Sequence, residues 1–203
     1  MAATDPTQPR PAAFPQEAAH LPQMREARRH EFLAGRAALH RAIAGLGWAP
    51  QPIPIRADRA PDLPVGICAS LSHSRTLCVA VADRLETTVG LGLDLEPATP
   101  LDRGLWPTVC TRAERGWLAA QPEAERGVLA KQIFCAKEAA YKCQYALTGV
   151  LLDFDAFEIT FADGKRFFAT IRQPVASFTV GDRIHGRMDR VAGHIVTATR
   201  IPA

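Results

Sequence analysis

Two acidic residues and two glycines alternate with leucine in the segment VGLGLDLEP, residues 89–97. If this segment is a β-strand, its side chains alternate between faces, so Asp94 and Glu96 share one face with both glycines and the leucines share the other. The two carboxylates then lie side by side, next to glycines that leave room for a close neighbour. Paired carboxylate oxygens suit a hard cation such as Mg²⁺, whose shell is often completed by substrate phosphates. An exposed strand end with two solvated acids is the alternative.

A second set of chemically capable residues lies in the segment VLAKQIFCAKEAAYKCQYAL, residues 128–147. At about 100° per residue, one stripe of a helix here carries Lys131, Cys135, Glu138 and Lys142. Glu138 would supply the third acid of a three-carboxylate Mg²⁺ site, and Lys142 would be available to phosphate oxygens. The alternative is a surface ion pair between these two residues, which are spaced i, i+4.

A third candidate is SLSHSRT, residues 70–76, where His73 and Ser74 would suit an anion contact at a strand entrance. The chain has no G-x-S-x-G nucleophile elbow. It also has no P-loop, and no G-x-G-x-x-G pattern follows a strand. These absences disfavour hydrolases and nucleotide-binding proteins that rely on these motifs.

Taken together, SLSHS, VGLGLDLEP and FCAKEAAYK resemble, in this order and spacing, the signature of the 4′-phosphopantetheinyl transferases of the surfactin and enterobactin synthetase-associated type. The upstream RRHEFLAGR and the connector RAPDLP belong to the same resemblance, although Leu63 stands where the family often has tryptophan. The resemblance implies transfer of the phosphopantetheine arm of coenzyme A to a serine of an acyl, aryl or peptidyl carrier protein, with release of adenosine 3′,5′-bisphosphate. It leaves siderophore, nonribosomal peptide, polyketide and fatty-acid pathways open.

The resemblance also implies roles for individual residues. Asp94, Glu96 and Glu138 would hold Mg²⁺, or Mn²⁺ in its place, on the coenzyme A pyrophosphate. Glu138 would take the proton of the incoming serine, directly or through a water, and Lys142 would stabilise or protonate the departing phosphate. Contacts to the nucleotide and its 3′-phosphate map to Arg28, Arg36, Arg56, Ala57, Asp58, Arg59, His73 and Ser74, and a further coenzyme contact maps to Leu152.

A mixed α/β framework is needed to position these residues. Apolar periodicity predicts long helices over residues 25–47 and 123–147. Short apolar or alternating runs predict strands at residues 77–82, 89–96, 157–171 and 191–199. Five prolines predict an irregular connector over residues 49–66, and residues 1–22 are expected to form a flexible extension.

The resemblance suggests a pseudo-twofold pair of lobes, residues 23–98 and 99–203, each a small sheet packed on a long helix. The coenzyme would lie between the lobes, and a monomer is expected because one chain supplies both. Two rival functions stay open: a Mg²⁺-dependent nucleotide phosphohydrolase that uses water as acceptor, and a non-catalytic module that binds coenzyme A or a carrier protein.

Composition fits a folded, cytoplasmic protein of 203 residues, with 47% hydrophobic and 22% charged residues. A net charge of +3 falls short of a nucleic-acid binder but would attract an acidic carrier protein. Five cysteines without a C-x-x-C pair indicate free thiols rather than a disulfide framework or a zinc site. No apolar run reaches the length of a signal peptide or a membrane span, so export and membrane insertion are not expected.

Overall fold

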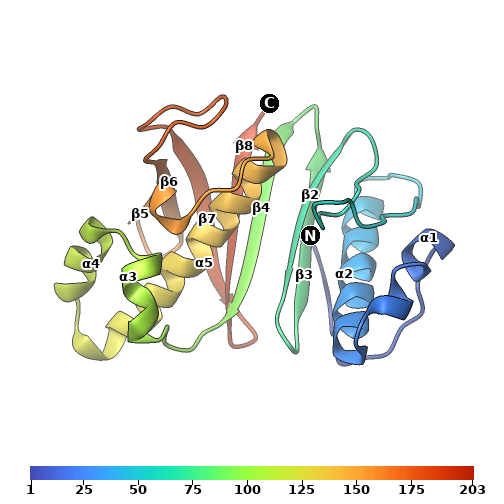
Figure 1. Ribbon diagram of the computed structural model, residues 1–203, viewed down its shortest axis with the longest axis horizontal. Coiled ribbons are helices and arrows are strands. Elements are labelled where there is room, and N and C mark those ends of the chain that lie inside the picture. The colour runs from blue at the N-terminus through green and yellow to red at the C-terminus, as the bar shows by residue number, and fades with distance from the viewer. The chain divides into compact units, whose positions relative to one another are not determined.

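The computed structural model describes residues 1–203 and divides the chain into two compact units. The N-terminal unit comprises Met1–Val89 together with Pro202 and Ala203, and the C-terminal unit comprises Gly90–Ile201. Each unit contains a small sheet and a long helix packed against it, which confirms the predicted mixed α/β class (Figure 1). The boundary between the units falls between Val89 and Gly90, whereas the sequence analysis placed it after residue 98. It lies earlier because the strand that carries Asp94 belongs to the C-terminal sheet.

In the N-terminal unit, a 3-stranded antiparallel sheet in the order β1-β3-β2 packs on helix α2. Ala34, Ala38 and Leu39 of α2 are fully buried against the sheet, so the small side chains let the helix lie close to the strands. The elements of this unit are β1 (Ala2–Thr4), α1 (Pro15–Ala18), a 3-10 turn (Leu21–Gln23), α2 (Glu26–Ala44), β2 (Ile67–His73) and β3 (Cys78–Arg84).

Residues 1–22 are docked on the N-terminal unit, which corrects the expected flexible extension. β1 pairs with β3, and the hydroxyl of Thr4 donates a hydrogen bond to the Ala34 carbonyl at 2.8 Å. The carboxylate of Glu17 is fully buried and accepts from the backbone N–H of Ile53 at 2.9 Å and from His40 at 2.7 Å. Strand pairing and the hydrogen bonds that the buried Glu17 carboxylate accepts fix this segment, and neither produces a hydrophobic period in the sequence.

The C-terminal unit holds a 5-stranded sheet in the order β4-β8-β7-β6-β5, with helix α5 lying against it (Figure 1). Its core joins apolar side chains of α5 to those of the sheet, including the fully buried Ile133, Phe167 and Ile195. The elements are β4 (Thr88–Pro97, whose first two residues fall in the N-terminal unit), a 3-10 turn (Arg103–Leu105), α3 (Trp106–Val109), α4 (Arg112–Ala119), α5 (Glu123–Thr148), a second 3-10 turn (Phe154–Ala156), β5 (Phe157–Phe161), β6 (Arg166–Ile171), β7 (Arg183–Val191) and β8 (His194–Pro202).

Both predicted long helices are confirmed, and the two ends of α5 carry residues that mark helix ends in a sequence. Two acids, Glu123 and Glu125, lie in its first turn, where the positive end of the helix dipole favours them. Gly149 ends the helix with a φ of 65°, a left-handed conformation that glycine adopts without steric cost.

Three strands lie outside those that the sequence predicted: β1, in the docked N-terminal segment, β2 and β7. β2 contains SLSH, which the sequence placed before the first strand, because the positions of β2 that are buried include the polar Ser70 and Ser72. β7 alternates exposed charged residues with buried Ile184, Gly186 and Met188, and the central glycine weakens its apolar signal. The ring of Phe167 packs directly over Gly186, where a Cβ would stand only 2.1 Å from it.

Candidate active site

The face of β4 that carries both glycines and both acids is turned toward α5, as the alternation of the sequence predicted. A Cβ added at Gly90 would lie 3.0 Å from the Cys143 sulfur, and one added at Gly92 would lie 1.8 Å from the Ala139 carbonyl oxygen. The strand and the helix therefore approach at backbone distance next to the acids. Glycine is required at position 92 because no side chain fits there.

Two lysines of α5 bind the two acids of β4. The Lys142 ammonium donates to Asp94 Oδ1 at 2.7 Å and to the Leu93 carbonyl at 3.0 Å. The Lys131 ammonium donates to Glu96 Oε2 at 3.1 Å. The Asp94 side chain is only 6% exposed, so its charge lies in a low-dielectric setting where the lysine matters more than it would at the surface.

Glu138 lies on the same stripe of α5 and interacts electrostatically with the acids of β4. Burial raises the pKa of the Glu138 carboxyl, the charges of Asp94 and Glu96 raise it further, and Lys142 partly offsets them. The structure thus brings the three predicted carboxylates and Lys142 into one electrostatic cluster. It contains no group of three acidic, histidine or cysteine side chains already arranged to hold a metal ion.

A pocket of about 190 Å³ opens beside Glu138. Its lining is mostly apolar and aromatic and comprises Lys137, Glu138, Tyr141, Leu152, Asp153, Phe154 and Phe157. Leu152, predicted from sequence as a coenzyme contact, therefore lies in the same pocket as the candidate catalytic acid. Such a lining suits a flexible organic chain whose reactive end lies next to a carboxylate.

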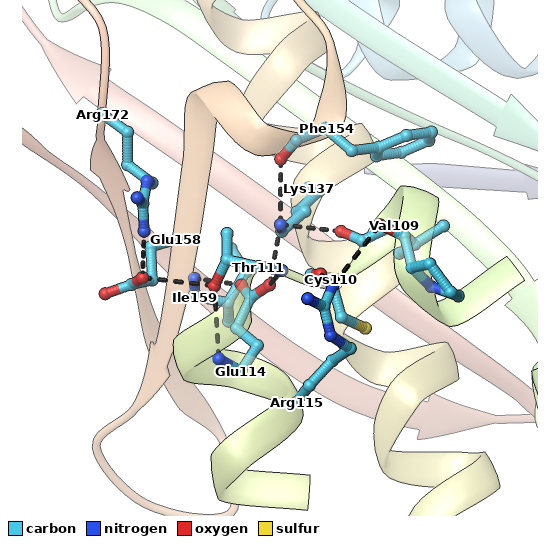
Figure 2. Close-up of polar contacts among 11 residues, drawn as sticks. Val109, Cys110, Thr111, Glu114, Arg115, Lys137, Phe154, Glu158, Ile159 and Arg172 are labelled. Carbon is cyan, nitrogen blue, oxygen red and sulfur yellow. Dashed lines mark hydrogen bonds and ion pairs between the residues drawn. The ribbon is translucent and has the colours of Figure 1, made fainter.

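The residue that precedes Glu138 is a buried lysine that anchors the helix (Figure 2). The Lys137 ammonium contacts Glu114 Oε2 at 2.8 Å and donates to the carbonyls of Val109 at 2.8 Å and Phe154 at 2.9 Å. Glu114 in turn accepts from the backbone N–H of Ile159 at 2.7 Å. Sequence reasoning assigned Lys137 no role, because a buried lysine cannot be told from a surface lysine until its partners are known.

Glu114 also organises the start of α4. The Thr111 hydroxyl accepts from the Glu114 backbone N–H at 3.2 Å, and the Glu114 carboxylate accepts from the Thr111 backbone N–H at 2.7 Å, which is a complete capping box. The pattern T-x-x-E at residues 111–114 was the available sequence signal for this contact.

In the N-terminal unit the structure brings together two of the predicted coenzyme contacts. Arg28 Nη1 donates to His73 Nε2 at 3.0 Å and to Glu31 Oε2 at 3.1 Å. Arg36, by contrast, is only 6% exposed, lies over the Phe32 ring and donates to the Pro54 carbonyl at 3.2 Å. Its buried Nε has no hydrogen-bond partner, and burial lowers the pKa of Arg36 to about 10.

The predicted segment from Arg56 to Arg59, which includes Ala57 and Asp58, forms a tight turn. Asp58 pairs with Arg56 Nη2 at 3.2 Å and accepts from the Ala60 backbone N–H at 3.0 Å. Arg59 adopts a left-handed φ of 69°. Ser74 has a separate structural duty, since its hydroxyl accepts from the Leu77 backbone N–H at 3.1 Å in the turn between β2 and β3.

Two models of known protein families match the chain, one in each unit. Residues 16–83 match the model of the 4′-phosphopantetheinyl transferase N-terminal domain. Residues 90–197 match the model of the 4′-phosphopantetheinyl transferase superfamily. The chain belongs to this superfamily. The second match begins at Gly90 and takes in every acid of the candidate site, so this 4′-phosphopantetheinyl transferase carries its carboxylates in the C-terminal unit.

One curated relative matches nearly the whole transferase, and two others match 73% of it. It is 35% identical over 203 residues to the 4′-phosphopantetheinyl transferase Svp of Streptomyces mobaraensis, covering 98% of this chain and 82% of that protein. It is 34% identical over 149 residues to Npt of Nocardia iowensis, covering 73% of this chain and 66% of that protein. It is 34% identical over 151 residues to PptT of Mycobacterium tuberculosis, covering 73% of this chain and 65% of that protein. All three are named 4′-phosphopantetheinyl transferases, so the chain is a transferase enzyme.

Proposed function

We propose that the protein transfers the 4′-phosphopantetheine group of coenzyme A to a serine hydroxyl of an acyl, aryl or peptidyl carrier protein and releases adenosine 3′,5′-bisphosphate. The observation that carries the proposal is the cluster of Asp94, Glu96 and Glu138 with two lysines, next to an apolar pocket that contains Leu152. Membership of the superfamily supports assigning this reaction to the cluster. The motif spacing favours the type associated with surfactin and enterobactin synthetases.

The carboxylates suit a divalent metal ion in kind. Carboxylate oxygens are hard donors, and burial together with the charges of Asp94 and Glu96 raises the pKa of Glu138, an effect that a bound cation would oppose. We therefore assign Mg²⁺, or Mn²⁺ in its place, to Asp94, Glu96 and Glu138. When bound, the ion would neutralise charge on the pyrophosphate and on the bridging oxygen that leaves.

The protein's own side chains would perform the proton transfers. In the reaction a new bond forms between the serine oxygen and the β-phosphorus, and the bond between that phosphorus and the bridging oxygen breaks. Glu138, with a raised pKa, is suited to accept the serine proton, directly or through one water. Lys142 would stabilise or protonate the departing phosphate, and the pocket would keep water from the pantetheine arm.

The N-terminal unit offers cationic groups for the nucleotide. Arg28 and His73 form one cluster, and the buried Arg36 presents an Nε that lacks a hydrogen-bond partner. An unsatisfied buried donor is costly, so an acceptor oxygen of the coenzyme would stabilise it. The exposed Arg56, in the turn that ends at Arg59, would add charge, and Ser74 would contribute its backbone and hydroxyl.

The acceptor would be an acidic carrier protein, attracted by the net charge of +3. We expect a monomer, because one chain carries matches to both family models. None of the helices has both the length and the apolar character that crossing a bilayer requires.

The test is transfer to a panel of apo carrier proteins with coenzyme A and Mg²⁺, read as intact carrier mass with and without EDTA. We expect a gain of one phosphopantetheine unit that EDTA abolishes. Glu138→Gln should lower the rate roughly 10²- to 10⁴-fold, the usual contribution of a general base, while coenzyme A binding is largely retained.

Glu125→Gln is the matched control, since Glu125 lies on the same helix but is exposed in its first turn. This variant should transfer at the wild-type rate. Free phosphopantetheine released without any carrier would indicate the phosphohydrolase instead. Coenzyme A binding without transfer to any carrier, unaffected by Glu138→Gln, would indicate a binding module.

A further inference from the structure

Helix α5 is attached to the sheet by two hydroxyl groups on either side of Glu138. The Thr197 hydroxyl donates to the Cys135 carbonyl at 2.8 Å, and the Thr199 hydroxyl donates to the Ala139 carbonyl at 2.9 Å. Both threonines belong to β8, and their side chains are 0% and 1% exposed. The two acceptors are four residues apart on the helix, and Glu138 lies between them in the same turn.

The spacing of donors and acceptors is matched. Residues i and i+4 of a helix are separated by about 6 Å along its axis. Residues i and i+2 of a strand are separated by about 6.6 Å and face the same side. Two hydrogen bonds can therefore form at once only if the helix keeps one rotation and one axial position over β8. Turning the helix by one residue, about 100°, would carry both carbonyls away from the hydroxyls.

The same contact fixes the distance to the acids. A Cβ on Gly92 would lie 1.8 Å from the Ala139 carbonyl oxygen and 2.6 Å from the Thr199 hydroxyl, so this carbonyl, this hydroxyl and the β4 backbone meet at one point. β4 and β8 are neighbours in the sheet, and β4 carries Asp94 two residues beyond the glycine. The helix turn that carries Glu138 is thereby held in register with the strand that carries Asp94.

Neither hydroxyl is needed to satisfy the helix. Carbonyls inside an α-helix already accept the N–H of residue i+4, so each threonine adds a second bond to an oxygen that has one. The Thr197 hydroxyl also lies 3.3 Å from the Cys135 sulfur. The helix itself does not depend on the added bonds, which instead join it to β8.

We propose that Thr197 and Thr199 are positioning residues that set the rotation and depth of Glu138 relative to Asp94 and Glu96. This inference rests on the proposed transferase function, because it assigns the threonines to the carboxylate site of that reaction. It predicts that removing the hydroxyls without changing side-chain shape impairs metal binding and the rate, while the fold and coenzyme affinity are retained.

The experiment compares Thr197→Val, Thr199→Val and the double valine variant with the corresponding serine variants. Valine keeps the shape and removes the hydroxyl, whereas serine keeps the hydroxyl and removes a methyl group. Thr170→Val is the control, since Thr170 lies on β6 with its side chain on the opposite face of the sheet from the buried Ala169 and Ile171. The measurements are Mn²⁺ affinity by electron paramagnetic resonance, kcat, KM for coenzyme A, and melting temperature.

We expect the double valine variant to lose about 10- to 100-fold in Mn²⁺ affinity and in kcat, the range found when groups that orient metal ligands are removed. KM for coenzyme A should stay near the wild-type value, and both serine variants and Thr170→Val should behave as wild type. If the valine variants fold poorly, the serine variants decide: a merely structural role makes them lose activity in proportion to melting temperature, which overturns the proposal.

Valine variants that fold and keep wild-type Mn²⁺ affinity and kcat would also overturn it, and the transferase function would stand. Wild-type protein that binds no Mn²⁺ and modifies no carrier would overturn the proposed function, and this inference with it.

Discussion

Replacing Gly92 by alanine should destabilise the C-terminal unit, because the added methyl group has no space. Its Cβ would lie 1.8 Å from the Ala139 carbonyl oxygen, 2.8 Å from the Ala139 carbonyl carbon and 2.6 Å from the Thr199 hydroxyl oxygen. Ordinary contacts of a Cβ begin at 3.4 Å, so strand and helix must separate by about 1.6 Å. The obstructing atoms are mostly backbone, which cannot turn aside as a flexible side chain does.

Overpacking of a well-filled core costs about 1–3 kcal/mol, and a backbone clash belongs at the upper end of that range. Alanine also restricts the unfolded chain, which returns about 0.4–1 kcal/mol. We therefore expect Gly92→Ala to lower the free energy of unfolding by about 2–2.6 kcal/mol. The shift should also break the Thr199 bond to Ala139.

Urea denaturation followed by tryptophan fluorescence measures this change. Trp48 is in the N-terminal unit and Trp106 and Trp117 are in the C-terminal unit, so a Trp48→Phe background reports the C-terminal unit alone. The matched control is Gly116→Ala in α4, where nothing lies within 4 Å of the added Cβ. It should raise the free energy of unfolding by about 0.5–1 kcal/mol, as expected inside a helix. A Gly92→Ala variant within 0.5 kcal/mol of wild type would refute the reasoning.

Two further predictions concern buried ionic groups. Lys137→Met should lower the free energy of unfolding, measured by urea denaturation, by about 3–5 kcal/mol, because it leaves the Glu114 charge buried without its partner. The double variant Lys137→Met with Glu114→Gln should recover part of that loss. Equal losses in the single and double variants would contradict the pairing. Burial alone would raise the pKa of Glu17, but hydrogen bonds from His40 and the Ile53 N–H outweigh it and hold the pKa below the ordinary value of 4.5. The stability that Glu17 contributes should therefore be complete above pH 4.5 and be lost as the pH falls through the lowered pKa. The difference in unfolding free energy between wild type and Glu17→Gln should shrink on acidification. A difference that stays constant with pH would contradict this assignment.

The sequence predicted the carboxylate cluster because its pattern is local. Alternation along β4 placed Asp94 and Glu96 on the face with the glycines, and helical periodicity placed Glu138 and Lys142 on one stripe. Each inference needs only the geometry of one element. The long helices were predictable for the same reason.

The contacts that hold the cluster could not be predicted, since they join distant positions without a periodic signal. Thr197 and Thr199 alternate in a strand as any half-buried threonines do, and their acceptors are backbone oxygens that every sequence has. Lys137 lies 23 positions beyond Glu114, and nothing in either segment marks the pair as buried. The N-terminal segment was misjudged because its docking depends on Glu17, an acid that composition assigns to the surface.

The network around Lys137 has a consequence for how the C-terminal unit opens. Glu114 accepts both the Thr111 and the Ile159 backbone N–H groups, and its carboxylate is held in place by the same ammonium that binds the Val109 and Phe154 carbonyls. Water cannot reach either amide without exposing the ion pair between Lys137 and Glu114. Once that pair is exposed, the hydrogen bonds it makes to the neighbouring backbone segments are lost together. The amides of Thr111 and Ile159, 48 positions apart, should therefore exchange with deuterium in a single cooperative event that includes the middle of α5.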